Sequence, residues 1–395
     1  MDRVSPYDPD LLRRRPDLEA PELVAVDAAD RLLLDVAAEA LRRTDGAIAT
    51  IGDSYGAVTL GAVDLTGRSD LRSFQDGLVH ERALARNAAE QGLHRAYRSY
   101  PLSPELLDGV STVLLRLPRA LDELDELAWT IAAHARPDVQ VFAAGRLKHM
   151  SVSMNAVLAR HFGAVTASLA RQKSRVLVAR EPLDVTATSF PRRSGHDVGL
   201  DRPLELRAFG ATFGGAALDP GTRLLLPHLQ GISVGRSVAD GIGGPVEAEV
   251  IDLGCGNGAI SAFLALSRPD LRLHASDQSA SAVASTLATA AANGVADRVA
   301  VSRDDALSAR PDASARVIVL NPPFHSGSTV HEGIAHRLFD ACARVLTEGG
   351  ELWTVWNSHL RYRPVLERTI GPTRQLDRTS RFTVTVSTRR KRPHG

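Results

Sequence analysis

Short apolar runs recur along the C-terminal half of the chain, and each ends in a polar or glycine-containing turn. Residues 250–253 read Val-Ile-Asp-Leu and lead into a glycine-rich turn, which an apolar segment of helical type follows from Ala259. Further runs of strand type cover 271–276, 299–302 and 318–320. Strands that alternate with helical segments indicate an open α/β sheet. Because ligands of such sheets bind at the carboxyl ends of the strands, we expect the site among these turns.

The last of these runs ends in the turn Asn321-Pro322-Pro323-Phe324. Two successive prolines prevent both helix and ladder pairing, so the chain must leave the sheet here in a stiff, extended turn. The turn presents the Asn321 amide, the Pro322 carbonyl and the Phe324 ring. Two acceptors and an aromatic face suit a planar target with an NH2 group. For this motif alone, a plain proline turn after a buried strand remains the alternative.

The glycine-rich turn carries Gly254, Gly256 and Gly258 at alternate positions. Glycine lets backbone N–H groups approach a ligand closely. The spacing differs from the Gly-x-Gly-x-x-Gly of loops that cradle a dinucleotide pyrophosphate. Asp277 follows the second run, where a carboxylate can accept both hydroxyls of a ribose. The loop and the carboxylate together favour a ligand that contains a ribose.

Composition and charge set the class of protein. The chain has 395 residues, 44% of them hydrophobic, which is enough for the cores of two domains. Its two cysteines and 13 histidines show neither a disulfide framework nor metal-ligand spacing. A net charge of +1 excludes a globally basic nucleic-acid binder and leaves a local basic face possible. With no membrane-spanning run and no signal peptide at Met1, we expect a soluble, cytoplasmic protein without a metal.

The N-terminal half repeats the pattern of the C-terminal half. When residues 48–62 are aligned with residues 250–264, the outer glycines of the loop are retained as Gly52 and Gly56. The middle glycine is replaced by Ser54. A shared loop with a missing glycine predicts a duplicated copy of the fold whose site has been dismantled.

The acid and the proline turn can be compared in the same way. Asp76 lies after Gly52 at nearly the interval that separates Asp277 from its own glycine loop. In the place of the Asn-Pro-Pro-Phe turn the N-terminal half has Arg116-Leu117-Pro118-Arg119. A turn without the amide and the ring cannot bind a flat amine. Arg116 and Arg119 could bind RNA phosphates, or they could be solvated surface charges.

The order of glycine loop, acid and proline turn resembles that of the class I S-adenosylmethionine-dependent methyltransferases. The resemblance implies two tandem Rossmann-like α/β domains with seven-stranded sheets, the N-terminal copy being degenerate. By this resemblance the glycines frame the methionine end of the cofactor, and Asp252 orients its amino group through the loop. Asp277 would hold the ribose, and Asp305 would meet the adenine amino group. The residues so assigned to the cofactor are Asp252, Gly254, Gly256, Gly258, Asp277, Asp305 and Asn321.

A degenerate copy followed by an active copy is similar to the bacterial ribosomal RNA guanine-N2 methyltransferases of the RsmC/RlmG type. The resemblance covers nearly the whole chain and includes residues 213–223 and 357–362. Details near 28–30, 116–119 and 357–362 are more similar to the members that act on large-subunit 23S rRNA than to those that act on 16S rRNA. The family implies methylation of ribosomal RNA by a monomer.

In this interpretation the catalytic residues are Asn321, Pro322 and Phe324. The Asn321 Oδ1 and the Pro322 carbonyl accept the two N–H bonds of the base amine, which directs its lone pair at the methyl group. Phe324 stacks on the flipped base. The turn alone would serve adenine N6 or a protein glutamine amide equally well. A non-catalytic RNA-binding assembly factor could also retain the fold.

Composition shifts predict the domain boundaries. Prolines among many charges indicate a loose arm over residues 1–21. The degenerate domain, with a role in RNA recognition or in structure, covers 1–180. Residues 181–203 have the composition of a linker that closes with a hairpin. The catalytic domain covers 204–395.

Overall fold

The computed structural model describes residues 7–184, 187–233, 249–323 and 329–391. Its chain separates into two compact units, residues 1–190 and 191–395. The boundary falls inside the predicted linker, residues 181–203. Strand β7 (Ser174–Pro182) extends two residues into that segment, and strand β8 (Arg192–His196) already belongs to the second unit. The second unit therefore begins earlier than the predicted residue 204, because β8 pairs antiparallel with β9 (Leu204–Ala208) in a hairpin.

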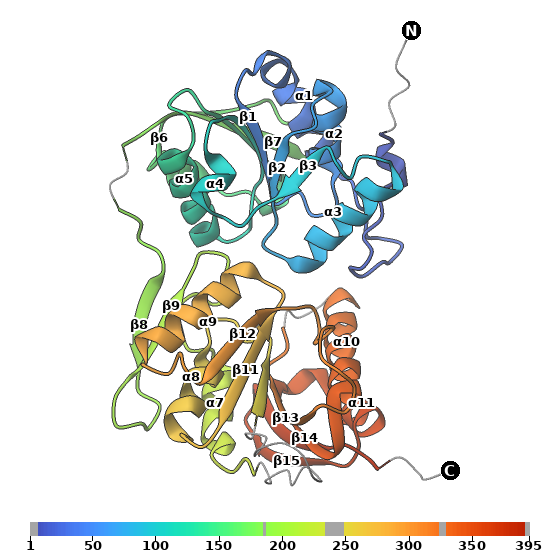
Figure 1. The fold of residues 1–395 in the computed structure, drawn as a ribbon, viewed down its shortest axis with the longest axis vertical. Helices are drawn as coiled ribbons and strands as arrows, with labels where there is room; N and C mark the ends of the chain where they lie inside the picture. The colour runs from blue at the N-terminus through green and yellow to red at the C-terminus, as the bar shows by residue number, and fades with distance from the viewer. Residues whose placement is uncertain (1–6, 185–186, 234–248, 324–328, 392–395) are drawn as a thin grey trace, which may run out of the picture. The chain divides into compact units, whose positions relative to one another are not determined.

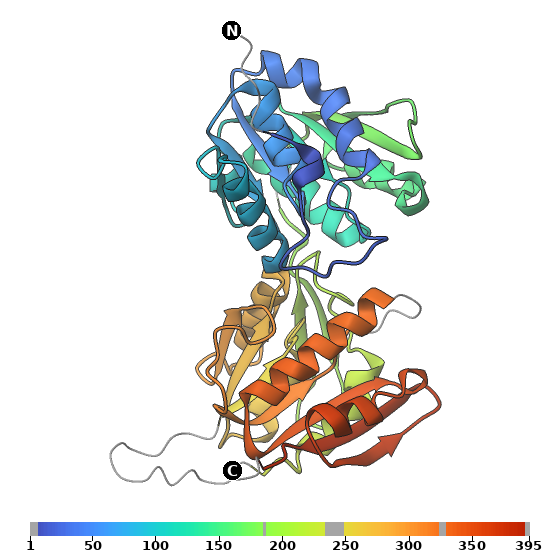
Figure 2. The ribbon, with the colours of Figure 1, turned by 90° about the vertical axis from the view of Figure 1, so that its right-hand side faces the viewer.

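Both units contain a seven-stranded mixed sheet with helices on its faces (Figures 1 and 2), so the predicted fold class is confirmed. The first sheet has the order β3-β2-β1-β4-β5-β7-β6 and the second the order β12-β11-β10-β13-β14-β16-β15. The first unit comprises β1 (Ala47–Ile51), β2 (Leu71–Phe74), β3 (Tyr97–Ser99), β4 (Val110–Arg116), β5 (Gln140–Arg146), β6 (Phe162–Ala167), β7 (Ser174–Pro182), α1 (Ala28–Arg43), α2 (Ala57–Thr66), α3 (Leu78–Glu90), α4 (Pro104–Leu107), α5 (Leu121–His134) and α6 (Val152–Leu158). The second comprises β10 (Glu249–Leu253), β11 (Arg272–Asp277), β12 (Val299–Arg303), β13 (Ala315–Leu320), β14 (Leu346–Asn357), β15 (Thr373–Arg378), β16 (Phe382–Thr388), α7 (Pro220–Leu229), α8 (Ala259–Ser267), α9 (Ala280–Ala292), α10 (Thr329–Val345) and α11 (Arg363–Thr369), besides the β8–β9 hairpin.

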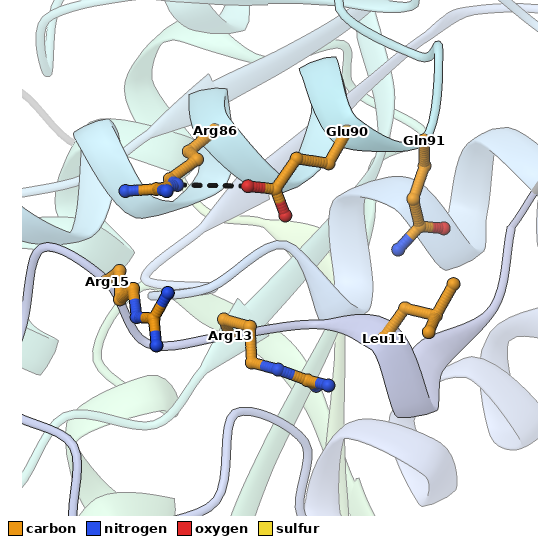
Figure 3. A pocket seen from close by; sticks show the side chains of 6 residues that line it. All are labelled: Leu11, Arg13, Arg15, Arg86, Glu90 and Gln91. Carbon is orange, nitrogen blue, oxygen red and sulfur yellow. Dashed lines mark hydrogen bonds and ion pairs between the residues drawn. The ribbon is translucent and has the colours of Figure 1, made fainter.

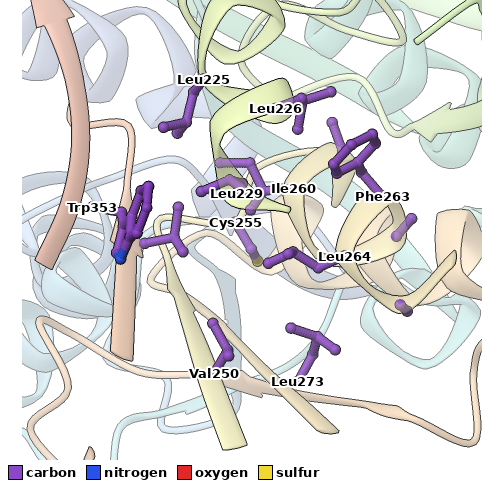
Figure 4. Close-up of a cluster of buried hydrophobic side chains, with 14 of the residues drawn as sticks. Leu225, Leu226, Leu229, Val250, Cys255, Ile260, Phe263, Leu264, Leu273 and Trp353 are labelled. Carbon is purple, nitrogen blue, oxygen red and sulfur yellow. The ribbon is translucent and has the colours of Figure 1, made fainter. Parts of the chain in front are cut away.

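Helices cover both faces of the second sheet. Apolar side chains of α7, α8 and α9 share one core with Val250 of β10 and Trp353 of β14 (Figure 4). The next residue of β10, Ile251, points to the opposite core, which α10 and α11 complete with Phe339 and Leu366. Because successive strand residues face opposite sides, a strand buried on both faces is mainly apolar, and β10 carries Asp252 as its one fully buried polar residue. The four parallel strands β10 to β13 are thereby fixed with their carboxyl ends at one edge.

The two sheets are in matching register. Ile51 pairs with Phe74 in the first sheet as Leu253 pairs with Ser276 in the second. The residue that follows the paired position on the second strand is therefore Gln75 in the first unit and Asp277 in the second. The Ser54 N–H donates to Gln75 Oε1 at 3.1 Å, as the Gly256 N–H donates to Asp277 Oδ2 at 3.1 Å. The sequence alignment with Asp76 was wrong by one residue, because spacing alone does not fix strand register.

The described part of the N-terminal arm is not loose. Its Asp8 N–H donates to Gln91 Oε1 at 2.9 Å, and its Arg13 N–H donates to Asn87 Oδ1 at 3.0 Å. Leu12 between them is buried in a cluster with α2 and α3. Figure 3 shows the arm running beside the last turn of α3. The arm is therefore fixed by hydrogen bonds to side chains of α3 and of the residue after it, which its own composition does not reveal. In the second unit, Asn293 bonds to the backbone of Glu205 of β9 in the same manner.

Candidate active site

A cavity of about 630 Å³ opens at the carboxyl ends of β10, β11, β12 and β13. It collects the glycine loop, the acid that ends the second strand, the acids after the third strand and the proline turn at one place, as the sheet topology predicts. The lining residues used below are Phe213, Asp219, Thr222, Gly254, Gly256, Asp277, Asp304, Asp305, Asn321, Pro322, Arg337 and Asn357.

The glycine loop has the backbone conformation that its composition requires. Gly254, Gly256 and Gly258 all have positive φ, at 72°, 54° and 77°. Gly258 is also the residue before α8, and a Cβ there would lie 2.9 Å from the Cα of Thr286 on α9. Gly254 and Gly256 have open space beside them and line the cavity, whereas Gly258 is not among the lining residues. The third glycine therefore serves helix packing, and the first two border the ligand space.

Asp252 lies beneath the loop and not in the cavity lining. Its Oδ2 accepts from the Ser261 N–H at 3.1 Å and from the Ser261 Oγ at 2.6 Å, which ties β10 to the first turn of α8. Burial raises the pKa of Asp252 to about 6, although the two hydrogen bonds from Ser261 lower it. Its expected effect on a ligand could act only through the loop that it holds.

Asp277 lines the cavity and braces the loop at the same time. Its Oδ2 accepts from the Gly256 N–H at 3.1 Å, and its Oδ1 accepts from the Ser279 N–H at 2.9 Å before α9. This fixes the carboxylate at the tip of β11, where the ribose contact was predicted.

The two acids after β12 have different surroundings. Asp304 is buried and accepts from Ser308 Oγ at 2.5 Å and from the Ala309 N–H at 3.0 Å, so it closes its own turn. Both acids line the cavity, but Asp305 forms an ion pair with Arg337 of α10. Sequence reasoning did not find Arg337, because nothing in the local pattern of α10 shows which of its charges faces the cavity.

The Asn321 amide is held in one orientation. Its Nδ2 donates to Asp219 Oδ2 at 3.0 Å and to Thr222 Oγ1 at 2.8 Å. An ionised carboxylate can only accept, so the nitrogen must be the atom on that side. Oδ1 is buried, and no group among the described residues donates to it. Pro322 also lines the cavity, whereas Phe324 lies outside the described residues.

Arg116 and Arg119, predicted as possible phosphate contacts, have different surroundings. Arg116 lies at the end of β4, and its guanidinium is paired with Asp27 at 3.0 Å and with Asp30 at 2.5 Å. Its side chain is 21% exposed, and both carboxylates belong to the start of α1. The geometry therefore speaks against a phosphate role for Arg116, since its charge is compensated inside the first unit. Arg119 is exposed, with its Nη2 3.5 Å from His149 Nε2.

Several cavity residues were missed by sequence reasoning. Segments 213–223 and 357–362 were noted for their resemblance, yet Phe213, Asp219, Thr222 and Asn357 were not assigned to the site. All four line the cavity, and Phe213 is 66% exposed. The Asp-Pro pair at the start of α7, a typical helix start, was the available signal for Asp219.

Two negative findings apply to the described residues only. No helix in them is long and apolar enough to cross a membrane. In the same part of the chain, no group of three or more His, Cys, Asp or Glu residues could hold a metal ion.

Comparison with known proteins agrees with this arrangement. Residues 5–183 match the family described as "RLMG N-terminal domain", and residues 204–386 match "Methyltransferase small domain". A protein of Ectopseudomonas mendocina (strain ymp) named "Ribosomal RNA large subunit methyltransferase G" is 34% identical over 377 residues, which are 94% of this chain and 96% of that protein. The chain belongs to the ribosomal RNA large subunit methyltransferase G family. A family member of the same name from Pseudomonas fluorescens (strain Pf0-1) is 33% identical over the same share of both chains.

Among solved structures, the fold is similar to that of the T. thermophilus 16S rRNA N2 methyltransferase RsmC, determined with AdoMet and guanosine. That comparison covers 92% of both chains at a TM-score of 0.70 and 22% identity, and it shows the shared two-unit fold. The resemblance drawn from the sequence is confirmed, and so is the assignment of the chain to the methyltransferases.

Proposed function

We propose that this chain transfers a methyl group from S-adenosylmethionine to the exocyclic N2 of a guanine in large-subunit ribosomal RNA. The observation that carries the proposal is the buried, undonated Oδ1 of Asn321 at the cavity, held there by bonds to the amide nitrogen. The names of the relatives support ribosomal RNA of the large subunit as the target.

The residues around the cavity fit the proposed cofactor. The glycine loop borders one end of a cavity of about 630 Å³, and its Gly256 N–H donates to Asp277, which lies beside it. Asp277 would hold the ribose hydroxyls, and Asp305 would accept from the adenine amino group. Asp252 would hold the loop that surrounds the methionine end. When bound, the cofactor supplies a sulfonium-activated methyl group that needs no metal.

The amine of the target base is a poor nucleophile because its lone pair is delocalised into the ring. Asn321 Oδ1 and the Pro322 carbonyl would each accept a hydrogen bond from one of its two N–H groups. These bonds draw the nitrogen toward a tetrahedral shape and direct its lone pair at the methyl group. The Oδ1 needs little reorganisation for this task, because the bonds from Nδ2 to Asp219 and Thr222 already fix the amide. No strong base is required, since the nitrogen becomes acidic after methyl transfer. Phe324 would stack on the flipped base.

The test is Asn321→Ala in the full chain, with Asn155→Ala as matched control. Asn155 is exposed on α6 of the first unit, so its loss removes an amide without touching the cavity. Loss of one oriented acceptor should lower single-turnover methyl transfer by about 100-fold or more. Cofactor affinity, measured by calorimetry, should stay unchanged, because the proposed acceptor acts on the base amine; a loss of affinity would instead make Asn321 a cofactor-binding residue. Asn321→Ala with normal turnover would contradict the proposed role.

The substrate is tested with tritiated methyl groups on stripped 23S rRNA, stripped 16S rRNA and assembled subunits. Label at guanine N2 of 23S rRNA, located by mass spectrometry of digested RNA, is the expected result. Label in 16S rRNA, at adenine N6 or in a protein glutamine would replace the proposed target. No label on any substrate would favour a non-catalytic assembly factor.

A further inference from the structure

The start of α7 makes two hydrogen bonds to the proposed catalytic amide. Asp219 is the residue before α7, and its Oδ2 accepts from the Thr222 N–H at 2.8 Å as well as from Asn321 Nδ2 at 3.0 Å. Thr222, in the first turn, accepts from the same Nδ2 at 2.8 Å through its Oγ1. Both contacts span about a hundred positions, so the helix start and the proline turn are brought together only by the fold.

An asparagine amide has two orientations of similar intrinsic energy, which exchange oxygen for nitrogen. In the wrong orientation Nδ2 would take the place of Oδ1 and could not accept a hydrogen bond. Asp219 excludes that orientation, because its carboxylate would then face the amide oxygen, and two acceptors repel each other. The bond from Nδ2 to an ionised carboxylate is also stronger than a bond between neutral groups.

The first unit contains the same arrangement of a helix start bonded to one side chain at the end of the fourth strand, with different charges. Leu115 pairs with Ile51 as Leu320 pairs with Leu253, so Arg116 stands where Asn321 stands. Its partners are Asp27, the residue before α1, and Asp30 in the first turn. In both units, the residue before the helix and the third residue of the helix therefore hold the residue that follows Leu115 or Leu320 of the fourth strand. In the first unit the held residue is the cation Arg116 in place of Asn321, and the Asp30 carboxylate stands in place of the Thr222 hydroxyl.

We propose that Asp219 and Thr222 are positioning residues that keep the Asn321 carboxamide oriented so that Oδ1 can accept a hydrogen bond from the amine that receives the methyl group. They act through Asn321 and need not touch the substrate or the cofactor. The inference rests on the proposed role of Asn321 and deepens it: the specificity of the site for an amino group depends on a helix start outside the proline turn.

Two pairs of variants test the two residues. Thr222→Val removes the hydroxyl at nearly equal size, and Thr222→Ser retains it. Asp219→Ser still caps α7, since serine is as good a residue before a helix as aspartate, but it is too short to reach Asn321 Nδ2 as well. Asp219→Asn keeps an oxygen at that distance. All four are made in the full chain and compared in single-turnover rate, cofactor affinity and melting temperature.

Thr222→Val and Asp219→Ser should lower the single-turnover rate by roughly 10- to 100-fold, with cofactor affinity unchanged, because a misplaced acceptor loses alignment. Thr222→Ser should restore the rate, and Asp219→Asn should restore part of it. In an Asn321→Ala background neither loss should recur. Normal rates in Thr222→Val and Asp219→Ser, with Asn321→Ala inactive, would overturn the positioning role alone. An active Asn321→Ala would instead refute the proposed function. Equal losses with and without Asn321 would show a merely structural role.

Discussion

Replacing Arg116 by Asn tests whether the dismantled site of the first unit has become a structural ion cluster. The Arg116 guanidinium lies between Asp27 and Asp30, whose side chains are 21% and 8% exposed. Burial raises the pKa of Asp30 to about 7 even though Arg116 opposes this shift. For Asp27, burial is outweighed by the bond and charge of Arg116, which lower its pKa to about 2. Two carboxylates at one helix start thus depend on one cation.

Removing one partner of a buried ion pair typically costs about 3–5 kcal/mol, because it leaves a buried charge without compensation. We expect Arg116→Asn to lower the unfolding free energy of the first unit by about that much. The folded-state pKa of Asp30 is already about 7, above its unfolded value of 3.8, and loss of the cation raises it further. The folded state then binds more protons than the unfolded state, so stability falls as pH increases. The loss should therefore be larger at pH 8 than at pH 5.5.

Hydrogen exchange across a urea series, read on peptides from α1 and β4, measures the first unit separately from the second. The double variant Asp30→Thr with Arg116→Asn transplants the uncharged pair of the catalytic unit, Thr222 and Asn321, and should recover most of the lost stability. A loss below about 1 kcal/mol, as for a surface pair, would refute the reasoning. So would a loss that does not change with pH.

Three further outcomes follow from the second unit. Asp252→Asn should stabilise it by about 2–3 kcal/mol at pH 7.5, because the folded carboxylate has a pKa of about 6 against 3.8 when unfolded. Since stability is lost as pH rises between those two values, the gain in urea-unfolding free energy should vanish near pH 4; a gain independent of pH would contradict this. Gly258→Ala should destabilise the unit by 1–3 kcal/mol, about the cost of overpacking, because its Cβ would meet the Thr286 backbone at 2.9 Å. Gly254→Ala, with open space at its Cβ, should unfold at a higher urea concentration than Gly258→Ala, yet weaken cofactor binding in calorimetry. A Gly254→Ala variant less stable than Gly258→Ala would be inconsistent with the loop geometry.

The arrangement shared by the two units suggests how a methyltransferase-like unit can lose the amide of its proline turn and remain folded. The helix start and the turn after the fourth strand meet in both units because the sheet order is the same. Once a catalytic amide is unnecessary, the buried position needs only polar groups that satisfy each other. A cation between two carboxylates meets that need, as Arg116 shows, and it also removes the acceptor that methyl transfer would use.

The sequence alone determined the features that depend on near neighbours. A glycine-rich turn between an apolar strand and an apolar helix, and an Asn-Pro-Pro turn after a strand, have few other conformations available. They therefore predicted the loop, the turn and the edge of the sheet where both lie. The same local logic found the duplicated loop at Gly52 and Gly56.

Tertiary structure alone decided which side chains meet across long separations. The partners of Asn321 lie about a hundred positions away, and Arg337 reaches Asp305 from α10. The register that makes Gln75 the counterpart of Asp277 also comes from strand pairing. None of these contacts leaves a periodic pattern in the chain, because each depends on where two separately formed elements pack.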